Sequence, residues 1–275
     1  MQVTVELKRL KSILNRISTI PKRTGSLEFT KLVGLHCKDN KFQMFITNEE
    51  NSARIQCEAT VTTPGKAIVN FYWLASIIKG VKSDVSFNLQ GNTLKVISST
   101  SQYNTEISHE KIPLPKMKLE SYPIKTPGKR MVEDIEMIRI CRSRQDDDGI
   151  FQMVNIAGSG NTILLAATDT GRVAISKPMW DAEENNLNIC LTNSTMDILK
   201  KIVSGSDEDV KINSTKRQVF FEGGDFSLVC RIPSETFPNI FKLVPKTHDF
   251  NDVIVEGKDI FEALKRINSV SGHET

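Results

Sequence analysis

The feature that most constrains the fold is a segment near the start of the chain that returns near its end. VTVELKRLKSILNRI (residues 3–17) and VIVEGKDIFEALKRI (residues 253–267) are identical at seven of fifteen positions. Half of their offset is 125 residues, and at that spacing GKRMVEDIEMIRICR (residues 128–142) places Ile135 on Leu10 and Ile138 on Ile13. An internal repeat of this kind predicts successive copies of one folding unit.

A second pair of segments supports the same period. WLASIIKGVKSDVSFN (73–88) and ILKKIVSGSDEDVKIN (198–213) share Asp, Val and Asn at an offset of 125 residues. Each reads as a short helix, a charged turn and a strand, and proline-rich seams at 111–129 and 237–250 fit unit boundaries. We predict units at 1–120 and 121–247, followed at 248–275 by the opening strand and helix of an incomplete third unit. On this arithmetic the chain is either a fragment or naturally truncated.

Composition narrows the class of protein. No apolar run approaches the ~20 residues that span a bilayer, and the N-terminus lacks the pattern of a signal peptide, so we expect a cytoplasmic protein with no membrane partner. The five cysteines and four histidines are scattered without ligand spacing. They predict reduced thiols and no metal site. The chain shows no GxxxxGK[ST], GxSxG or HExxH motif, so we expect neither cofactor nor catalysis.

Basic residues gather on the predicted first helix. The net charge is only +3, yet Leu7 to Arg23 contains six basic residues and no acidic one. On a helical wheel Lys8 and Arg16 lie opposite the apolar stripe and Lys11 lies on its flank. Lys200 and Lys201 occupy a second such helix, near 194–204. One basic helix is typical of any solvent-exposed surface, but its repetition favours sequence-independent contact with a phosphate backbone.

Two further motifs carry a resemblance to a known family. ILLAATDTGRVAISK (163–177), followed by ETFPNIFKLVPK (235–246), resembles the second domain of the bacterial replicative sliding clamp, the β subunit of DNA polymerase III. The resemblance implies an α+β fold of repeated DNA-clamp domains, each with two helices packed on antiparallel sheets. It further implies a processivity factor whose two subunits close a ring around double-stranded DNA. The implied partners are the polymerase III catalytic subunit, the clamp loader and other proteins with a clamp-binding motif.

The resemblance also implies functional residues. DNA contacts would come from the loops after the first helix of each domain, and the subunit contact from an edge strand near 101–108, which requires a complete third domain for a homodimer ring. A hydrophobic partner peptide would enter a pocket between the second and third domains. The DNA residues are Lys22, Arg23, Arg142, Arg144 and Gln145; the pocket residues are Met153, Thr168, Gly171, Arg172, Val173, Pro238, Lys242 and Leu243.

Three alternatives stay open at the level of sequence. Asp169-Thr170-Gly171 matches the motif of retroviral-type aspartic proteases, but that chemistry needs two facing carboxylates that share a proton. The run Asp146 to Asp148 could hold Mg²⁺, but an acidic surface turn explains it better, because no other ligand set converges on it in the sequence. A clamp-like module could also sequester clamp partners without encircling DNA.

Overall fold

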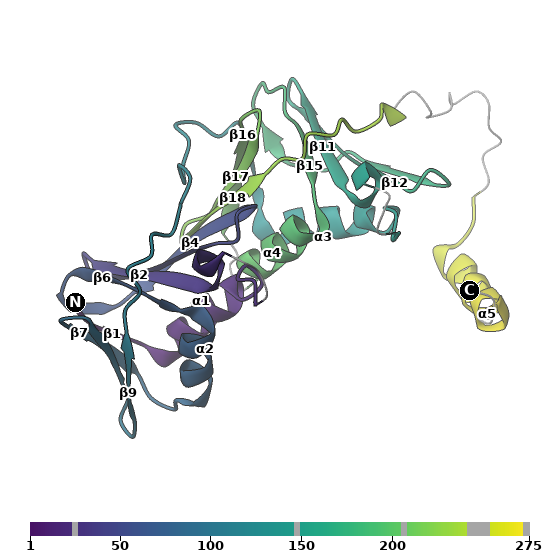
Figure 1. Ribbon diagram of the computed structural model, residues 1–275. Helices are drawn as coiled ribbons and strands as arrows, with labels where there is room; N and C mark the ends of the chain where they lie inside the picture. Colours follow the sequence, from purple (N-terminus) through teal and green to yellow (C-terminus); the bar gives the residue numbers. More distant parts are fainter. Residues whose placement is uncertain (24–26, 146–148, 205–207, 241–253, 272–275) are drawn as a thin grey trace. The chain divides into compact units, whose positions relative to one another are not determined.

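The structure is a computed structural model with side chains (Figure 1). It divides into two compact units, Met1–Phe237 and Pro238–Thr275, which are described separately. None of the helices in the described residues is long and apolar enough to cross a membrane. The structure describes residues 1–23, 27–145, 149–204, 208–240 and 254–271, apart from the side chains of 270 and 271.

The first unit contains two halves with the same order of elements. Each half begins with a strand and a helix, continues through a 3-10 turn and several strands to a second helix, and ends with three strands. The elements of the first half are β1 (Gln2–Val5), α1 (Leu7–Ile17), η1 (Glu28–Lys31), β2 (Leu32–Lys38), β3 (Lys41–Thr47), β4 (Asn51–Glu58), β5 (Thr60–Thr63), β6 (Gly65–Asn70), α2 (Phe71–Gly80), β7 (Val85–Gln90), β8 (Thr93–Ile97) and β9 (Gln102–Glu106).

The second half repeats this order. Its short strand β14 pairs with β10 as β5 pairs with β1 in the first half. The elements are β10 (Ile124–Pro127), α3 (Gly128–Arg139), η2 (Gly149–Gln152), β11 (Val154–Ser159), β12 (Thr162–Thr168), β13 (Val173–Ser176), β14 (Asp181–Ala182), β15 (Asn188–Leu191), α4 (Asn193–Val203), β16 (Asp209–Ser214), β17 (Gln218–Glu222) and β18 (Phe226–Arg231).

All strand pairs of the first unit are antiparallel, and one sheet crosses from one half to the other. The crossing is the β18–β4 pair, which runs from Phe226 opposite Ile55 to Cys230 opposite Asn51. This continuous sheet joins the halves through backbone hydrogen bonds. The three sheets have the strand orders β5-β1-β7-β8-β9, β14-β10-β16-β17-β18-β4-β3-β2-β6 and β13-β12-β11-β15.

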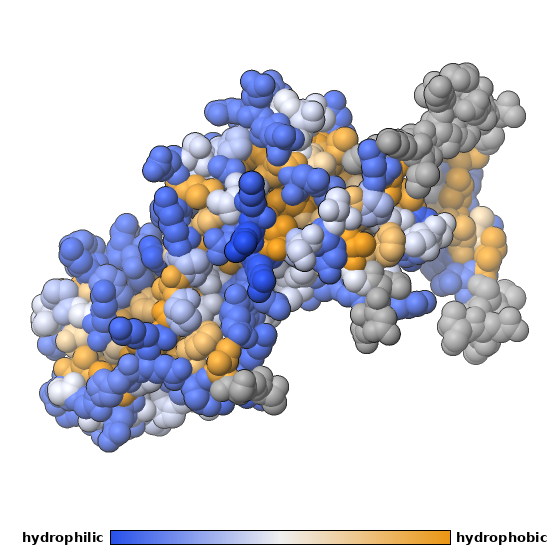
Figure 2. All heavy atoms as spheres, turned by 45° about the horizontal axis from the view of Figure 1, so that its top comes forward, coloured by the Kyte–Doolittle hydropathy of each residue, from blue (hydrophilic) through white to orange (hydrophobic). Residues whose placement is uncertain are grey.

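The helices bury apolar stripes under these sheets. On α1, Leu10, Leu14 and Ile17 are buried, at the i, i+4 and i+7 spacing of one helical face. The strands supply the other wall through alternation, as in β3, where Phe42 and Met44 point into the core. The outer face in Figure 2 is mostly hydrophilic, as expected when this alternation places polar residues outward. The predicted α+β fold of helices packed on antiparallel sheets is confirmed.

The second helix of each half starts in the same way. Asn70 caps α2, its side-chain oxygen accepting a hydrogen bond from the Trp73 N–H at 3.0 Å. Thr192 caps α4 and accepts from the Thr195 N–H at 3.2 Å. An Asn or Thr cap satisfies an N–H group that has no partner within the helix, so both sequences fix the same starting point.

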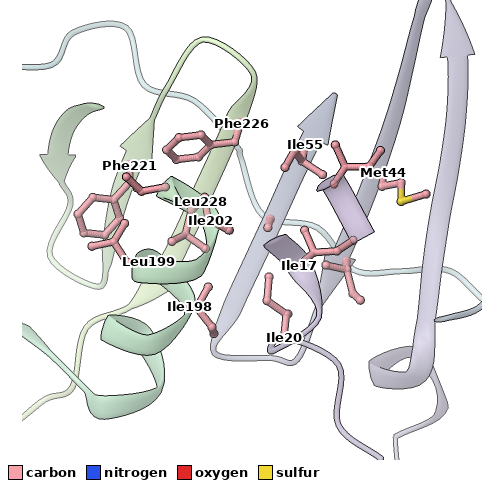
Figure 3. Close-up of a cluster of buried hydrophobic side chains, with 14 of the residues drawn as sticks. Ile17, Ile20, Met44, Ile55, Ile198, Leu199, Ile202, Phe221, Phe226 and Leu228 are labelled. Atoms are coloured by element: carbon pink, nitrogen blue, oxygen red, sulfur yellow. The ribbon is translucent and has the colours of Figure 1, made fainter. Parts of the chain in front are cut away.

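The four helices of the first unit follow one another in the order α2, α1, α4, α3, and neighbours in this row touch. The contact between α1 and α4 is continued in the core by side chains from both halves (Figure 3). Ile17 and Ile20 come from the first half, and Ile198, Ile202 and Leu228 come from the second; all are at most 2% exposed. The two halves therefore share one hydrophobic core.

The repeat is real in structure, but its spacing differs from the expected one in the first helix. The buried stripe Leu10, Leu14, Ile17 of α1 recurs in α3 as Met131, Ile135, Ile138, an offset of 121 residues rather than 125. The expected matches of Leu10 with Ile135 and Ile13 with Ile138 are wrong by four residues. Four residues are about one helical turn, so a shifted alignment presents nearly the same apolar stripe.

In the second unit the described residues form one helix, α5 (Gly257–Ser271). Ile260, Leu264 and Ile267 repeat the spacing of Leu10, Leu14 and Ile17, and all three are exposed. The unit boundaries predicted at residues 120 and 247 stay a prediction.

Candidate nucleic-acid and partner surfaces

The predicted DNA residues of the first half lie on or just after α1. Lys8, Lys11, Lys22 and Arg23 are all exposed. The Lys11 ammonium donates a hydrogen bond to the Val81 carbonyl at 3.1 Å, just beyond the C-terminus of α2. A cation is stabilised at that end of a helix by the helix dipole. These four exposed side chains thus place positive charge on α1 and in the segment that follows it.

Arg16 does not belong to this exposed set, contrary to the sequence prediction. Its side chain is only 6% exposed and forms a bidentate ion pair with Asp225, at 2.5 and 2.8 Å. Its Nε donates to the Ile202 carbonyl at 2.6 Å, and its guanidinium carbon lies 5.7 Å from the centre of the Phe226 ring. Arg16 joins α1 to the second half and is not available to a phosphate in this structure.

The basic residues of α4 are largely neutralised by acidic neighbours. Lys200 pairs with Glu136 of α3 at 3.0 Å. Arg139 pairs with the same carboxylate at 3.0 Å and with Asp197 at 2.7 Å. These two cations and two anions cancel in net charge, while Lys201 is half-buried. The positive charge expected on this helix from sequence is therefore much reduced.

The loop after α3 carries three predicted DNA residues. Arg144 and Gln145 are exposed, and Arg142 is half-buried with one NH group donating to the Ser143 carbonyl at 2.8 Å. Burial and the neighbouring charges of Arg139 and Arg144 lower the pKa of Arg142. Together with Glu136 and Ile140 the three arginines line a cavity of about 260 Å³. The predicted acidic turn, Asp146 to Asp148, lies outside the described residues.

The predicted partner pocket begins at the turn between β12 and β13. Thr168 is buried, and its hydroxyl donates to the Arg172 carbonyl at 2.8 Å and accepts from the Thr170 N–H at 3.1 Å. Thr170 has φ of 74°, a left-handed conformation that Thr rarely adopts. Gly171, Arg172 and Val173 are exposed around this turn.

The other members of the predicted pocket come from other parts of the chain. Met153 is half-buried immediately before β11, next to β12 in the same sheet. Pro238 is exposed in the second unit, and Lys242 and Leu243 lie outside the described residues. The residues that the structure brings together are thus those of the β12–β13 turn.

The Asp169-Thr170-Gly171 motif stabilises the turn between β12 and β13. The Asp169 carboxylate accepts hydrogen bonds from the Gly171 and Arg172 N–H groups at 3.1 and 3.0 Å, and from the Arg172 Nε at 2.8 Å. These bonds lower the pKa of Asp169, whereas the acid of a proteolytic dyad must share a proton with a second carboxylate. Across the described part of the chain, no three His, Cys, Asp or Glu residues are placed to hold a metal ion.

Comparison with known proteins agrees with this arrangement. Residues 125–239 match the family model described as DNA polymerase III beta subunit, central domain. The beta sliding clamp of Staphylococcus epidermidis is 24% identical over 271 residues, which cover 94% of this chain and 69% of that protein. The beta sliding clamp of Staphylococcus aureus is 22% identical over 249 residues, covering 86% of this chain and 66% of that protein.

Residues 125–239 thus match the central domain of the DNA polymerase III beta subunit, and the chain as a whole is similar to bacterial beta sliding clamps. Solved clamps share its fold: that of Bacillus subtilis superposes with a TM-score of 0.88 at 19% identity, over 100% of this chain and 75% of its own. A Pseudomonas aeruginosa sliding clamp, solved bound to griselimycin, gives a TM-score of 0.78 at 16% identity, covering 90% of this chain and 68% of its own.

Sequence reasoning missed several residues that shape the clamp surface. Tyr72 and Lys79 of α2 face the basic end of α1, and Glu136 and Asp197 neutralise the cations of the second half. A signal for the first two was present, because Tyr72, Ser76 and Lys79 lie at i, i+4 and i+7 on one face of α2. The pairs across α3 and α4 had no signal in the sequence.

Proposed function

We propose that this protein acts as a sliding clamp, a non-catalytic ring subunit that encircles double-stranded DNA and tethers the replicative polymerase to it. The observation that carries the proposal is the row of four helices, with Lys8, Lys11, Lys22 and Arg23 exposed along it. The match of residues 125–239 to the central domain of the DNA polymerase III beta subunit, and the similarity to beta sliding clamps, support the same function. The protein would work in the cytoplasm, where bacterial DNA lies.

The charge pattern supports weak, sequence-independent contact. Lysine and arginine side chains bind phosphates without reading base edges, and each contact releases counterions, so affinity falls as salt rises. Such contacts hold a protein near DNA but let it move along the duplex. Retention would then come from ring closure, with no need for tight binding.

A homodimer ring, which requires a complete third domain, would use the edge of the five-stranded sheet, as proposed for the segment 101–108. Within the described part of that sheet, β9 is an outer strand that pairs with β8 alone. Its first three residues, Gln102 to Asn104, are exposed. An outer strand presents unpaired N–H and C=O groups that a neighbouring chain can use. We propose that this edge meets the third domain of a second subunit.

The partner-binding role is proposed for the β12–β13 turn. Val173 is 41% exposed beside Thr168 and Gly171, and Met153 lies one strand away. The polymerase III catalytic subunit, the clamp loader and other proteins with a clamp-binding motif would each place a hydrophobic peptide there. Arg172, Pro238, Lys242 and Leu243 complete the proposed pocket.

The decisive experiment is topological. We expect the protein, loaded by the clamp loader onto a nicked circular plasmid, to remain bound through gel filtration and to be lost when the plasmid is linearised. A charge-reversed K22E/R23E variant should be retained less than wild type, and K216E/R217E should match wild type. Lys216 and Arg217 are exposed in the β16–β17 turn, and the six residues of β16 place that turn about 20 Å from the start of this strand.

Three outcomes would count against the proposal. Equal retention on circular and linear DNA would refute the proposal that the protein encircles DNA. Equal losses of retention in K22E/R23E and K216E/R217E would refute the proposal that Lys22 and Arg23 face the DNA. Binding of clamp-binding peptides without any retention on DNA would favour instead a module that sequesters clamp partners.

A further inference from the structure

The sheets of the first unit are built from two smaller sheets that occur once in each half. In the first half these are β5-β1-β7-β8-β9 and β4-β3-β2-β6; in the second half they are β14-β10-β16-β17-β18 and β13-β12-β11-β15. The β18–β4 pair joins two of them into the nine-stranded sheet. Among the described strands, the counterparts of this joined pair, β9 and β13, each have one unpaired edge. The first unit therefore carries both sides of a second junction.

Each of these two strands keeps the geometry of its counterpart. The β8–β9 and β17–β18 pairings agree residue for residue at an offset of 125. The β12–β13 and β3–β4 pairings agree in the same way at an offset of 121. Even the turns before β4 and β13 match, because Glu49 and Thr170, 121 residues apart, have φ of 78° and 74°. Strands of equal geometry present the same row of hydrogen-bonding groups to a neighbour.

The two offsets predict the register in which β9 and β13 would pair. At the internal junction Leu228 of β18 lies opposite Ala53 of β4, and both side chains are fully buried. The same offsets place Tyr103 of β9 opposite Ala174 of β13. Tyr103 is 39% exposed and is one of the large apolar side chains on the surface. Pairing in this register would cover it.

The free amide groups of both edges agree with this register. At the internal junction the Arg231 N–H donates to the Glu50 carbonyl at 2.7 Å, and the Gln56 N–H donates in the opposite direction. Every second residue of an antiparallel strand directs its N–H to the same neighbour. The offsets therefore point the Asn104 N–H away from β8 and the Ile175 N–H away from β12. Both are available to a new strand.

The helices beside the two edges also correspond to helices that pack at the internal junction. There α4 packs on α1, and Ile198 and Ile202 meet Ile17 and Ile20 in the shared core (Figure 3). By position in the repeat, α2 lies beside β9 as α4 lies beside β18, and α3 lies beside β13 as α1 lies beside β4. A second junction would thus bring α2 of one copy against α3 of another.

The side chains at those positions of α2 and α3 are apolar and incompletely buried. On α2, Trp73 and Ile77 stand 125 residues before Ile198 and Ile202 and are half-buried. On α3, Met137 stands 121 residues after Arg16 and is 54% exposed. Exposed apolar surface of this kind marks sites of protein contact.

The charges at the internal junction have neutral counterparts at the two free edges. Arg16 and Asp225 form an ion pair across the internal junction. Their counterparts, at offsets of 121 and 125, are Met137 and Thr100. A junction between β9 and β13 would therefore place an apolar and a neutral polar side chain where the internal junction holds two charges.

We propose that β9 of one copy of this chain pairs with β13 of a second copy, with α2 of the first packing on α3 of the second. The surfaces differ on the two copies, so the contact is heterologous and adds copies head to tail until a ring closes. The inference goes beyond the proposed function. In the proposed homodimer ring β9 meets a third domain, whereas this pairing uses residues of the first unit alone.

The test is the molar mass in solution, measured by sedimentation velocity from about 1 to 100 μM, the range of weak association. One copy has a mass of 30.9 kDa, and the wild-type mass should rise with concentration to multiples of this value. N104P and I175P each remove one outward N–H, at β9 and β13 respectively, and proline is tolerated in an edge strand at such a position. Each variant alone should stay at the mass of one copy.

Mixing the two variants gives the sharpest result. N104P keeps an intact β13 and I175P keeps an intact β9, so an equimolar mixture should form one junction and stop at twice the mass of one copy. This result also shows that both variants fold. Wild type that stays at one copy throughout, a dimer formed by N104P or I175P alone, or a mixture that stays at one copy while both variants are folded by circular dichroism would refute the pairing.

A second pair of variants covers the case in which a proline variant does not fold. Y103E and M137E place a charge on the β9 side and on the α3 side of the junction. Each should stay at the mass of one copy, and their mixture should dimerise. K216E, in the exposed β16–β17 turn, is the control and should associate like wild type. Equal association of M137E and K216E would refute the packing of α2 on α3.

The register has its own test. Residues that lie opposite each other in antiparallel strands have Cα atoms within the range of a disulfide. Y103C mixed with A174C should therefore give a disulfide-linked dimer in oxidised glutathione, identified by peptide mass spectrometry. Y103C mixed with I175C is the control, because residue 175 points to the other face of the strand. Equal yields from the two mixtures would overturn the register. None of these measurements involves DNA, so their failure would leave the retention test of the proposed function unaffected.

Discussion

The ion pair between Arg16 and Asp225 makes an asymmetric prediction about stability. The Arg16 side chain is 6% exposed and that of Asp225 is 37% exposed. Replacing Asp225 by Ala leaves a buried cation whose remaining partners, within the described residues, are the Ile202 carbonyl and the Phe226 ring. Breaking a buried pair by removing one partner costs ~3–5 kcal/mol. Because water reaches part of this site, we expect about 3 kcal/mol for D225A.

Removing the arginine instead of the aspartate should cost less stability. R16M replaces the guanidinium with an apolar chain of similar length in an apolar setting, and leaves the Asp225 carboxylate where water can solvate it. Loss of hydrogen bonds to a charged group costs about 1.5–3 kcal/mol, partly offset here by hydration of the carboxylate, so we expect about 1–2 kcal/mol. The double variant R16M/D225A should lose less than the sum of the single losses.

Thermal unfolding followed by circular dichroism measures these differences. For a unit of this size 1 kcal/mol corresponds to about 2–4 °C, so the D225A midpoint should fall by about 6–12 °C. The control is E58A, which removes the solvent-exposed pair between Arg9 and Glu58 and should leave the midpoint unchanged. A D225A midpoint equal to that of E58A, or strictly additive losses in the double variant, would refute the reasoning.

Three further predictions concern local structure. T192A should destabilise the first unit by about 1 kcal/mol through loss of the α4 cap, and T192S should restore most of it, as measured by urea denaturation. The pKa of Asp169 is lowered in the folded state, so its contribution is present above the ordinary value of 3.8 and is lost as pH falls through the folded pKa. The protection factors of the Gly171 and Arg172 amides, which are exchange rates corrected for the intrinsic rate at each pH, should therefore fall below about pH 4, and D169N should lack this change. Burial raises the pKa of the Cys230 thiol, so iodoacetamide at pH 8 should modify Cys230 only after unfolding, as read by peptide mass spectrometry.

Periodicity predicted the elements better than it predicted their alignment. The stripe Leu10, Leu14, Ile17 identified α1 and its buried face, and the offset of 125 matched β7 to β16 correctly, with Val85 and Val210 both buried. The first helices follow an offset of 121 instead. A helix repeats its face about every four residues, so hydrophobicity alone cannot distinguish alignments that differ by one turn.

The site residues were predictable only where a side chain acts within its own helix. A helical wheel places Arg16 with Lys8 on the polar face of α1. The partner that buries it, Asp225, is 209 residues further along the chain. Lys200 and Arg139 are neutralised in the same way by residues of the facing helix. Long-range pairing of this kind leaves no periodic signal, whereas the polar stripe of α2 does.

These pairings distribute the charge of the helix row unevenly. Within the described residues, the groove between α1 and α2 is lined by three cations that face no carboxylate, Lys11, Arg23 and Lys79, whereas Lys200 and Arg139 on α4 and α3 face two. An exposed ion pair must be broken before its cation can bind a phosphate, so paired cations release fewer counterions on binding. On the proposed function, the first half should therefore contribute most of the salt-dependent affinity for DNA. The cations of α3 and α4 would then contribute less to the affinity for DNA than those of the first half.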